Sequence, residues 1–165
     1  MRRVEELYDR FGSRLFHYLA LKLGSRTDAE DVLQEVLFRL LRYRGRFRFA
    51  RSPAAFAFQV ARNEAARFLT RNGRKPPAGA DADGFGMLAA EIFDGPDPVM
   101  LERAVGALIR IPEAQREVIV LKIYQGLSFR EIATVCGIPA DTAASRYRYG
   151  LEKLRAELEG KHGRS

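Results

Sequence analysis

Residues 125–149 read QGLSFREIATVCGIPADTAASRYRY, two helix-forming segments with a short turn between them. Ser128 and Glu131 have the spacing of a capping box, in which each side chain satisfies a free amide at the start of a helix. Gly137 allows a tight turn, and Ile132 supplies an apolar position on the first segment. The pattern predicts a helix-turn-helix unit, and an ordinary helical hairpin with a charged face is the alternative.

The segment after the turn is the one that would read DNA. Ala143 and Ala144 are small enough to let a helix approach a groove closely. Ser145, Arg146 and Arg148 offer hydroxyl and guanidinium donors to base edges and phosphates. This second segment is therefore interpreted as a DNA-reading helix.

Helical spacing of apolar residues extends on both sides of this unit, and neither a strand pattern nor an internal repeat is evident. We expect an all-α protein. In the carboxy-terminal part, helices are predicted over residues 99–109, 113–125, 128–135 and 140–158. In the amino-terminal part, one helix stops at Gly24-Ser25 and a second starts with a capping box of Thr27 and Glu30. A third runs from Ser52-Pro53 to about residue 71, with Phe56 as a candidate core position.

Residues 71–98 have a different composition from their flanks. They are rich in proline and glycine and carry a net negative charge, whereas both flanks are basic. This composition is typical of a linker, although a short helix over residues 85–93 is an alternative. We expect two small helical domains, residues 1–71 and 99–165, joined by a flexible linker of residues 72–98. Two basic modules on one tether suit binding to an extended polyanion.

The overall composition excludes several classes of function. The chain has 165 residues, with 28 lysines and arginines against 21 acids, and this excess favours a polyanionic partner. One cysteine and two distant histidines leave neither an internal disulfide nor a zinc cluster, and Cys136 is interpreted as a buried apolar filler. No phosphate-loop or hydrolase motif is present. We therefore expect a protein that is not an enzyme and that uses no cofactor or metal. The sequence shows no signal peptide or membrane-spanning segment, so we expect a cytoplasmic protein with no membrane insertion.

The second predicted helix has a polar stripe that includes one large aromatic residue. Asp31, Gln34, Glu35 and Phe38 fall on this stripe. An exposed phenylalanine among carboxylates is a plausible hot spot for a protein partner. The alternative, which the pattern alone favours, is that Phe38 packs on a neighbouring helix and the acids are merely solvated.

A long acid-free stretch follows between Glu35 and Glu64. Arginines stand at seven positions in it, and aromatics are interleaved with them: Tyr43, Phe47, Phe49, Phe56 and Phe58. Arginine neutralises phosphate, and aromatic faces stack on unpaired bases. The segment as a whole therefore favours binding to melted nucleic acid, whereas for any single phenylalanine packing in the core is the better interpretation.

Three motifs in this order resemble those of bacterial RNA polymerase sigma factors of the extracytoplasmic-function (ECF) type, the two-domain minimal form of the sigma-70 class. DAEDVLQEVLFRL (residues 28–40) is similar to the family's core-binding helix, and FAFQVARNEA (56–65) to its promoter-melting helix. IPEAQREV (111–118), with the helix-turn-helix after it, is similar to the family's carboxy-terminal domain. The resemblance implies a non-catalytic alternative sigma factor that binds core RNA polymerase, directs it to specific promoters and assists promoter opening.

The resemblance also implies a role for particular residues. Contact with core polymerase falls to Asp31, Gln34, Glu35 and Phe38. Contact with the melted non-template strand of the minus-ten element falls to Tyr43, Arg46, Phe47, Arg48, Arg51, Phe56, Arg62, Asn63 and Arg67. Recognition of the minus-thirty-five element as duplex falls to Thr142, Ser145, Arg146 and Arg148. An anti-sigma protein is a further candidate partner.

Two other functions fit the same residues. One is a stand-alone helix-turn-helix regulator that binds duplex DNA as a dimer, with the amino-terminal part as a partner-binding domain. The other is a sigma mimic that sequesters a partner without opening a promoter. The regulator differs from the sigma interpretation because its acidic and aromatic stripe does not need core polymerase. The mimic binds polymerase or an anti-sigma protein and differs because it opens no promoter.

Overall fold

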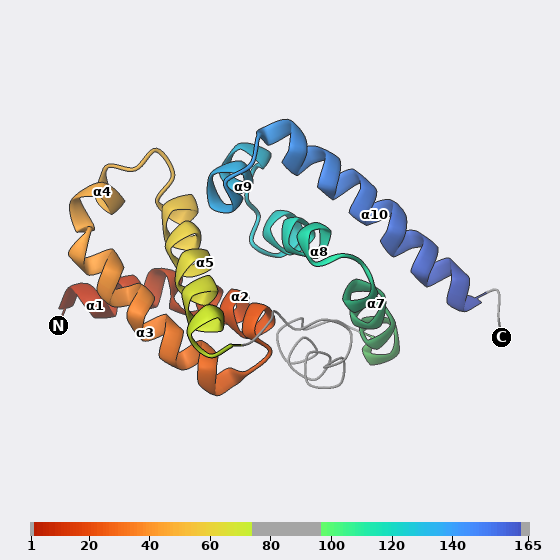
Figure 1. Cartoon of the computed structure of the whole chain (residues 1–165), viewed down its shortest axis with the longest axis horizontal. Coiled ribbons are helices and arrows are strands. Elements are labelled where there is room, and N and C mark those ends of the chain that lie inside the picture. The colour runs from red at the N-terminus through yellow and green to blue at the C-terminus, as the bar shows by residue number, and fades with distance from the viewer. Residues whose placement is uncertain (1, 74–96, 163–165) are drawn as a thin grey trace. The chain divides into compact units, whose positions relative to one another are not determined.

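The computed structural model describes residues 2–73 and 97–162, and every regular element within these two ranges is a helix (Figure 1). The all-α prediction is confirmed. Two compact units make up the chain, an amino-terminal one and a carboxy-terminal one. The central part of the predicted linker, with the alternative helix over residues 85–93, lies outside the described residues.

The amino-terminal unit is built on three long helices with shorter ones around them. Helices α2, α3 and α5 pack against one another, and the short α4 packs against α3 and α5 (Figure 1). The elements in order are α1 (Arg2–Leu7), the π-helix η1 (Tyr8–Gly12), α2 (Ser13–Leu23), α3 (Arg26–Arg42), α4 (Arg44–Arg48) and α5 (Pro53–Arg71).

Local chemistry sets where these helices begin and end. Gly24 ends α2 in the left-handed conformation, with φ of 69°, and its N–H donates to the Ala20 carbonyl. The extended Ser25 then caps α3, and its hydroxyl accepts from the Asp28 N–H at 3.2 Å. The predicted capping box of Thr27 and Glu30 is therefore wrong, because Ser25 caps α3 and Thr27 already lies in its first turn.

The predicted start of α5 is confirmed. Ser52 is extended and its hydroxyl accepts from the Ala55 N–H at 3.1 Å, while Pro53 occupies the first turn, where no N–H is needed. Residues at the centre of the unit are completely buried, and Phe58 is the largest of them. Its ring meets Tyr18 edge-on, with centroids 5.5 Å apart. Phe56, the expected core position, is only half-buried.

The carboxy-terminal unit packs its long last helix against the helices before it. Helix α10 contacts α7 and α8, and Val118, Leu121 and Ile132 are completely buried. Arg116 of α8 reaches back to the end of α7, where its Nη2 donates to the carbonyls of Ile109 (3.4 Å) and Ile111 (3.3 Å). The elements are α7 (Pro98–Arg110), α8 (Glu113–Ile119), the π-helix η3 (Val120–Tyr124), α9 (Phe129–Cys136) and α10 (Ala140–His162).

Helices α9 and α10 form the predicted helix-turn-helix. The Ser128 N–H donates to Glu131 Oε1 at 3.0 Å, and the Glu131 N–H donates to the Ser128 hydroxyl at 3.1 Å. This is the reciprocal capping box expected from the sequence. Gly137 has a φ of 66° in the turn, a conformation that favours glycine, and Cys136 is buried as expected.

Candidate functional site

The acidic and aromatic stripe of α3 faces away from the core. Asp31, Gln34, Glu35 and Phe38 are all exposed, and Phe38 exposes 66% of its surface. On the opposite side of the same helix, the apolar positions from Ala29 to Leu40 are buried. The pattern alone favours packing of Phe38 on a neighbouring helix. The exposure of Phe38 shows that this interpretation is wrong.

The arginine-rich segment after α3 is not one loop, because residues 44–48 form the short helix α4. Phe47 anchors this helix: it is buried, with its ring 5.7 Å from that of Phe11 and 6.2 Å from that of Phe56. Phe47 therefore has no face available for a base, which corrects its assignment to the minus-ten contacts. Its burial follows from the apolar surface that Phe11 and the start of α5 leave beside α4.

The other predicted contact residues of the segment after α3 are exposed, and most of them are positively charged. Tyr43 is 39% exposed, and Arg46, Arg48 and Arg51 are exposed. No acid occurs between Glu35 and Glu64 to neutralise them. A surface of this kind attracts phosphate, and the attraction weakens with salt.

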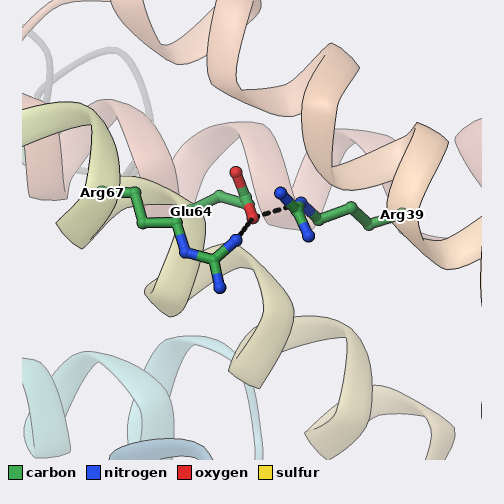
Figure 2. Close-up of polar contacts among 3 residues, drawn as sticks. All are labelled: Arg39, Glu64 and Arg67. Atoms are coloured by element: carbon green, nitrogen blue, oxygen red, sulfur yellow. Dashed lines mark hydrogen bonds and ion pairs between the residues drawn. The ribbon is translucent and has the colours of Figure 1, made fainter. Parts of the chain in front are cut away.

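Helix α5 carries a buried carboxylate that sequence reasoning missed. Glu64 is 4% exposed, and the guanidinium groups of Arg39 and Arg67 converge on it from α3 and α5 (Figure 2). Arg67 Nη1 donates to Glu64 Oε1 at 3.1 Å, while more than half of the Arg67 side chain remains exposed. The signal in the sequence was an acid at an apolar helical position, between the buried Ala61 and Ala65.

This ion-paired cluster lines a cleft of about 580 Å³ formed by residues of α3 and α5. Glu35 of the exposed stripe and Arg71 of the last turn of α5 also line the cleft. Two other predicted residues of α5 lie outside it: Asn63 is exposed and Arg62 is half-buried. The cleft is thus lined by one residue assigned to the protein partner, Glu35, and by one assigned to the nucleic acid, Arg67.

The first turns of α10 present the predicted reading residues. Thr142, Ser145 and Arg146 are half-buried, and Arg148 is exposed. At 100° per residue, Arg146 and Arg148 lie on opposite flanks of the outward face, and Ser145 and Tyr149 lie between them.

Two residues of α10 differ from their sequence interpretation. Ala143 is completely buried, so it packs inward and does not approach a groove. Tyr149, which the sequence did not single out, is 50% exposed, with the Arg148 guanidinium 5.2 Å from its ring centroid. An exposed tyrosine next to two predicted DNA contacts extends the surface that α10 could offer to a duplex.

Other kinds of site find little support in the part of the chain that the structure describes. Residues 2–73 and 97–162 contain no cluster of three or more His, Cys, Asp or Glu side chains that could hold a metal ion. Within the same ranges, no helix is both long and apolar enough to cross a membrane.

Comparison with known proteins identifies the two units. Residues 7–75 match the family model for sigma-70 region 2, and residues 101–154 match that for sigma-70 region 4. The RNA polymerase sigma factor CarQ of Myxococcus xanthus is 32% identical over 154 residues, which cover 93% of this chain and 88% of CarQ. The ECF RNA polymerase sigma factor SigL of Mycobacterium tuberculosis is 32% identical over 167 residues, 94% of this chain and 89% of SigL.

A solved structure has the same fold. The sigma factor RpoE of Bartonella quintana, crystallised with the anti-sigma factor NepR, superposes with a TM-score of 0.69 at 21% identity, over 94% of this chain and 95% of RpoE. Helical architecture, the order of the motifs and near full-length relatives all agree. The chain therefore belongs to the ECF sigma factors of the sigma-70 family, which bind core RNA polymerase and promoter DNA and direct transcription initiation to specific promoters.

Proposed function

We propose that this sigma factor divides its work among three surfaces. The α3 stripe of Asp31, Gln34, Glu35 and Phe38 binds core polymerase. The basic segment from Tyr43 to Arg51, with Arg62, Asn63 and Arg67 of α5, holds the melted minus-ten strand. The start of α10 recognises the minus-thirty-five element as duplex through Thr142, Ser145, Arg146 and Arg148.

The observation that carries the proposal is the exposed stripe of α3. A helix that met only water would present polar groups on its outer face, whereas this one presents Phe38 among carboxylates. A carboxylate-lined aromatic is well suited to a basic protein surface and poorly suited to DNA, because phosphates would be repelled. The adjacent Tyr43–Arg51 segment has the opposite charge and is suited to DNA.

We further propose that residues 1–71 and 99–165 act as the polymerase and minus-ten domain and as the minus-thirty-five domain, joined by residues 72–98. The chain would be non-catalytic and would use no cofactor, since binding energy alone can favour the melted strand. It would work in the cytoplasm with the polymerase. An anti-sigma protein would regulate it, a proposal supported by the complex of the Bartonella quintana RpoE with NepR.

Run-off transcription with purified core polymerase tests the proposal. The full-length protein should start transcription at a subset of promoters only when core enzyme is added. A stand-alone regulator would bind its duplex site tightly and specifically without core enzyme, and a sigma mimic would bind core enzyme without opening any promoter. Either of these two results would contradict the proposal.

A further inference from the structure

Helix α5 holds a carboxylate that none of the three proposed surfaces uses. Glu64 is 4% exposed, and Ala61 and Ala65 beside it in the helix are completely buried. Removal from water strongly disfavours a charged carboxylate unless it is paired and hydrogen-bonded. Two arginines meet this need at one atom: Arg39 of α3 and Arg67 of α5 both pair with Glu64 Oε1 (Figure 2). The position of each guanidinium group therefore depends on this one carboxylate.

The two arginines differ in how much of each side chain remains in solvent. The side chain of Arg39 is 35% exposed, whereas that of Arg67 is 58% exposed. Arg67 donates through Nη1 to Glu64 Oε1 at 3.1 Å. A guanidinium group has several N–H donors in one plane, so a bond at one edge orients the whole group and leaves the other donors available. Arg67 is therefore held by Glu64 and open to a second acceptor.

The charge of the cluster selects the chemistry of that acceptor. Two guanidinium groups share one carboxylate, so Arg39, Glu64 and Arg67 together keep an excess of positive charge. The other two charged residues of the cleft, Glu35 and Arg71, add no net charge to it. A phosphate of a nucleic-acid backbone is negatively charged and matches the planar donors of an arginine. A backbone phosphate is therefore the acceptor that suits this cluster.

The carboxylate has two opposing effects on a phosphate at Arg67. Its own charge repels the phosphate, but Arg39 pairs with the same oxygen and weakens this repulsion. In the other direction, an arginine side chain loses rotamer freedom when it binds a ligand, and the bond to Glu64 removes much of that freedom beforehand. Glu64 is itself fixed by its burial. Orientation should therefore outweigh repulsion.

We propose that Glu64 is a positioning residue for promoter DNA. It holds Arg67 so that the remaining N–H groups bind a phosphate of the melted minus-ten strand, while Arg39 neutralises the carboxylate. The proposal rests on the proposed function, which assigns Arg67 to this strand, and adds the acid that orients it. It reverses the expectation from charge alone, because removal of an acid near DNA would otherwise strengthen binding.

The test uses holoenzyme assembled from core polymerase and the full-length protein, and it measures affinity for a promoter fragment with an unpaired minus-ten region. Arg67→Gln should weaken binding by about fivefold, the effect of one surface ion pair. Glu64→Gln should weaken it by about two- to fivefold, although this variant gains positive charge. Glu157→Gln is the matched control, because Glu157 of α10 also pairs with an arginine of another helix, Arg110 of α7, at 3.9 Å. It should not weaken binding.

A double-mutant cycle shows whether Glu64 acts through Arg67. In the Arg67→Gln background, Glu64→Gln should cause no further loss of affinity, because the side chain that it positions is already absent. Core binding by Glu64→Gln, measured separately, should equal that of the wild type. A merely structural role would weaken core binding and DNA binding together and would persist in the Arg67→Gln background.

The outcomes separate this proposal from the proposed function. Unchanged or stronger promoter binding by Glu64→Gln would overturn the positioning role, and so would a further loss in the Arg67→Gln background or weakened core binding. No effect of Arg67→Gln would overturn both the assignment of Arg67 to the minus-ten strand and the positioning role. A wild-type protein that starts no transcription with core enzyme would instead contradict the proposed function as a whole.

Discussion

Single residues in the amino-terminal unit set the balance between packing and binding. Phe47 and Phe49 are two positions apart and have opposite surroundings, one buried and one 83% exposed. Glu64 stands among apolar positions of α5 and is satisfied by two arginines from different helices. Phe47 thus anchors the short helix that carries the exposed Phe49, and Glu64 holds the partly exposed Arg67. Both exposed side chains belong to the proposed DNA surface.

Loss of the Glu64 carboxylate should destabilise the amino-terminal unit. In Glu64→Gln the two guanidinium groups lose their counter-charge, but both can turn toward water, so we expect a loss of about 1–3 kcal/mol rather than the larger cost of a fully buried pair. Urea unfolding of the full-length chain measures the change. Glu30→Gln, at an exposed position of α3, should leave stability unchanged. Equal stability of Glu64→Gln and the wild type would contradict a structural role for the pair.

At the scale of helices, close packing between α8 and α10 depends on Gly150. A Cβ at this position would lie 2.9 Å from Ile119 Cδ1 and 3.1 Å from Gln115 Cβ. The Ile119 methyl group can move, but Gln115 Cβ is fixed to the backbone of α8. An added methyl group would therefore push the two helices apart.

Gly150→Ala should lower the melting temperature of the full-length protein, because the strain of overpacking, about 1–3 kcal/mol, exceeds the gain in helix propensity. Gly160 is the matched control, since it lies in the same helix and a Cβ there would meet no atom within 4 Å. Gly160→Ala should be neutral or slightly stabilising. Similar melting temperatures for the two variants would show that the contact at Gly150 is not tight.

The helices also show what sequence can and cannot predict. Ser52-Pro53 and the Ser128–Glu131 pair gave correct helix starts, because their side chains can satisfy the first free amides of a helix. Thr27 and Glu30 have the same spacing as Ser128 and Glu131 but lie inside α3, because Ser25 caps this helix earlier. The five-residue α4 is shorter than two helical turns, so no periodicity could distinguish it from a loop or separate Phe47 from Phe49. The position of Glu64 among apolar residues of α5 was visible in the sequence, but its ion pair with Arg39 was not, because Arg39 comes from another helix.

At the scale of the whole molecule, positive charge is distributed over both units, and the formal net charge is +7. The exposed arginines after α3 should contribute to the salt dependence of promoter binding, because each one that pairs with a phosphate releases counterions. Arg51→Gln should reduce the slope of log affinity against log salt by about 0.7, the value for one phosphate contact on a single strand. Holoenzyme binding to promoter DNA over a series of salt concentrations measures this slope.

Arg155→Gln is the control for this prediction. It removes the same charge from an exposed position of α10 beyond its first turns. The slope should be unchanged in this variant. Equal reductions in both variants would indicate that net charge, rather than the surface around α4, determines the salt dependence.

The division of labour between α3 and α10 is tested most directly by titrating core polymerase with the labelled full-length protein. Glu35→Lys, whose folding is checked by urea unfolding, should bind core enzyme at least about tenfold more weakly, because like charges across an interface cost several kcal/mol. Glu30→Lys, with the same charge change beside the stripe, and Arg146→Ala should bind core as the wild type does, while Arg146→Ala loses promoter selection. Undiminished core binding by a folded Glu35→Lys variant would contradict the account.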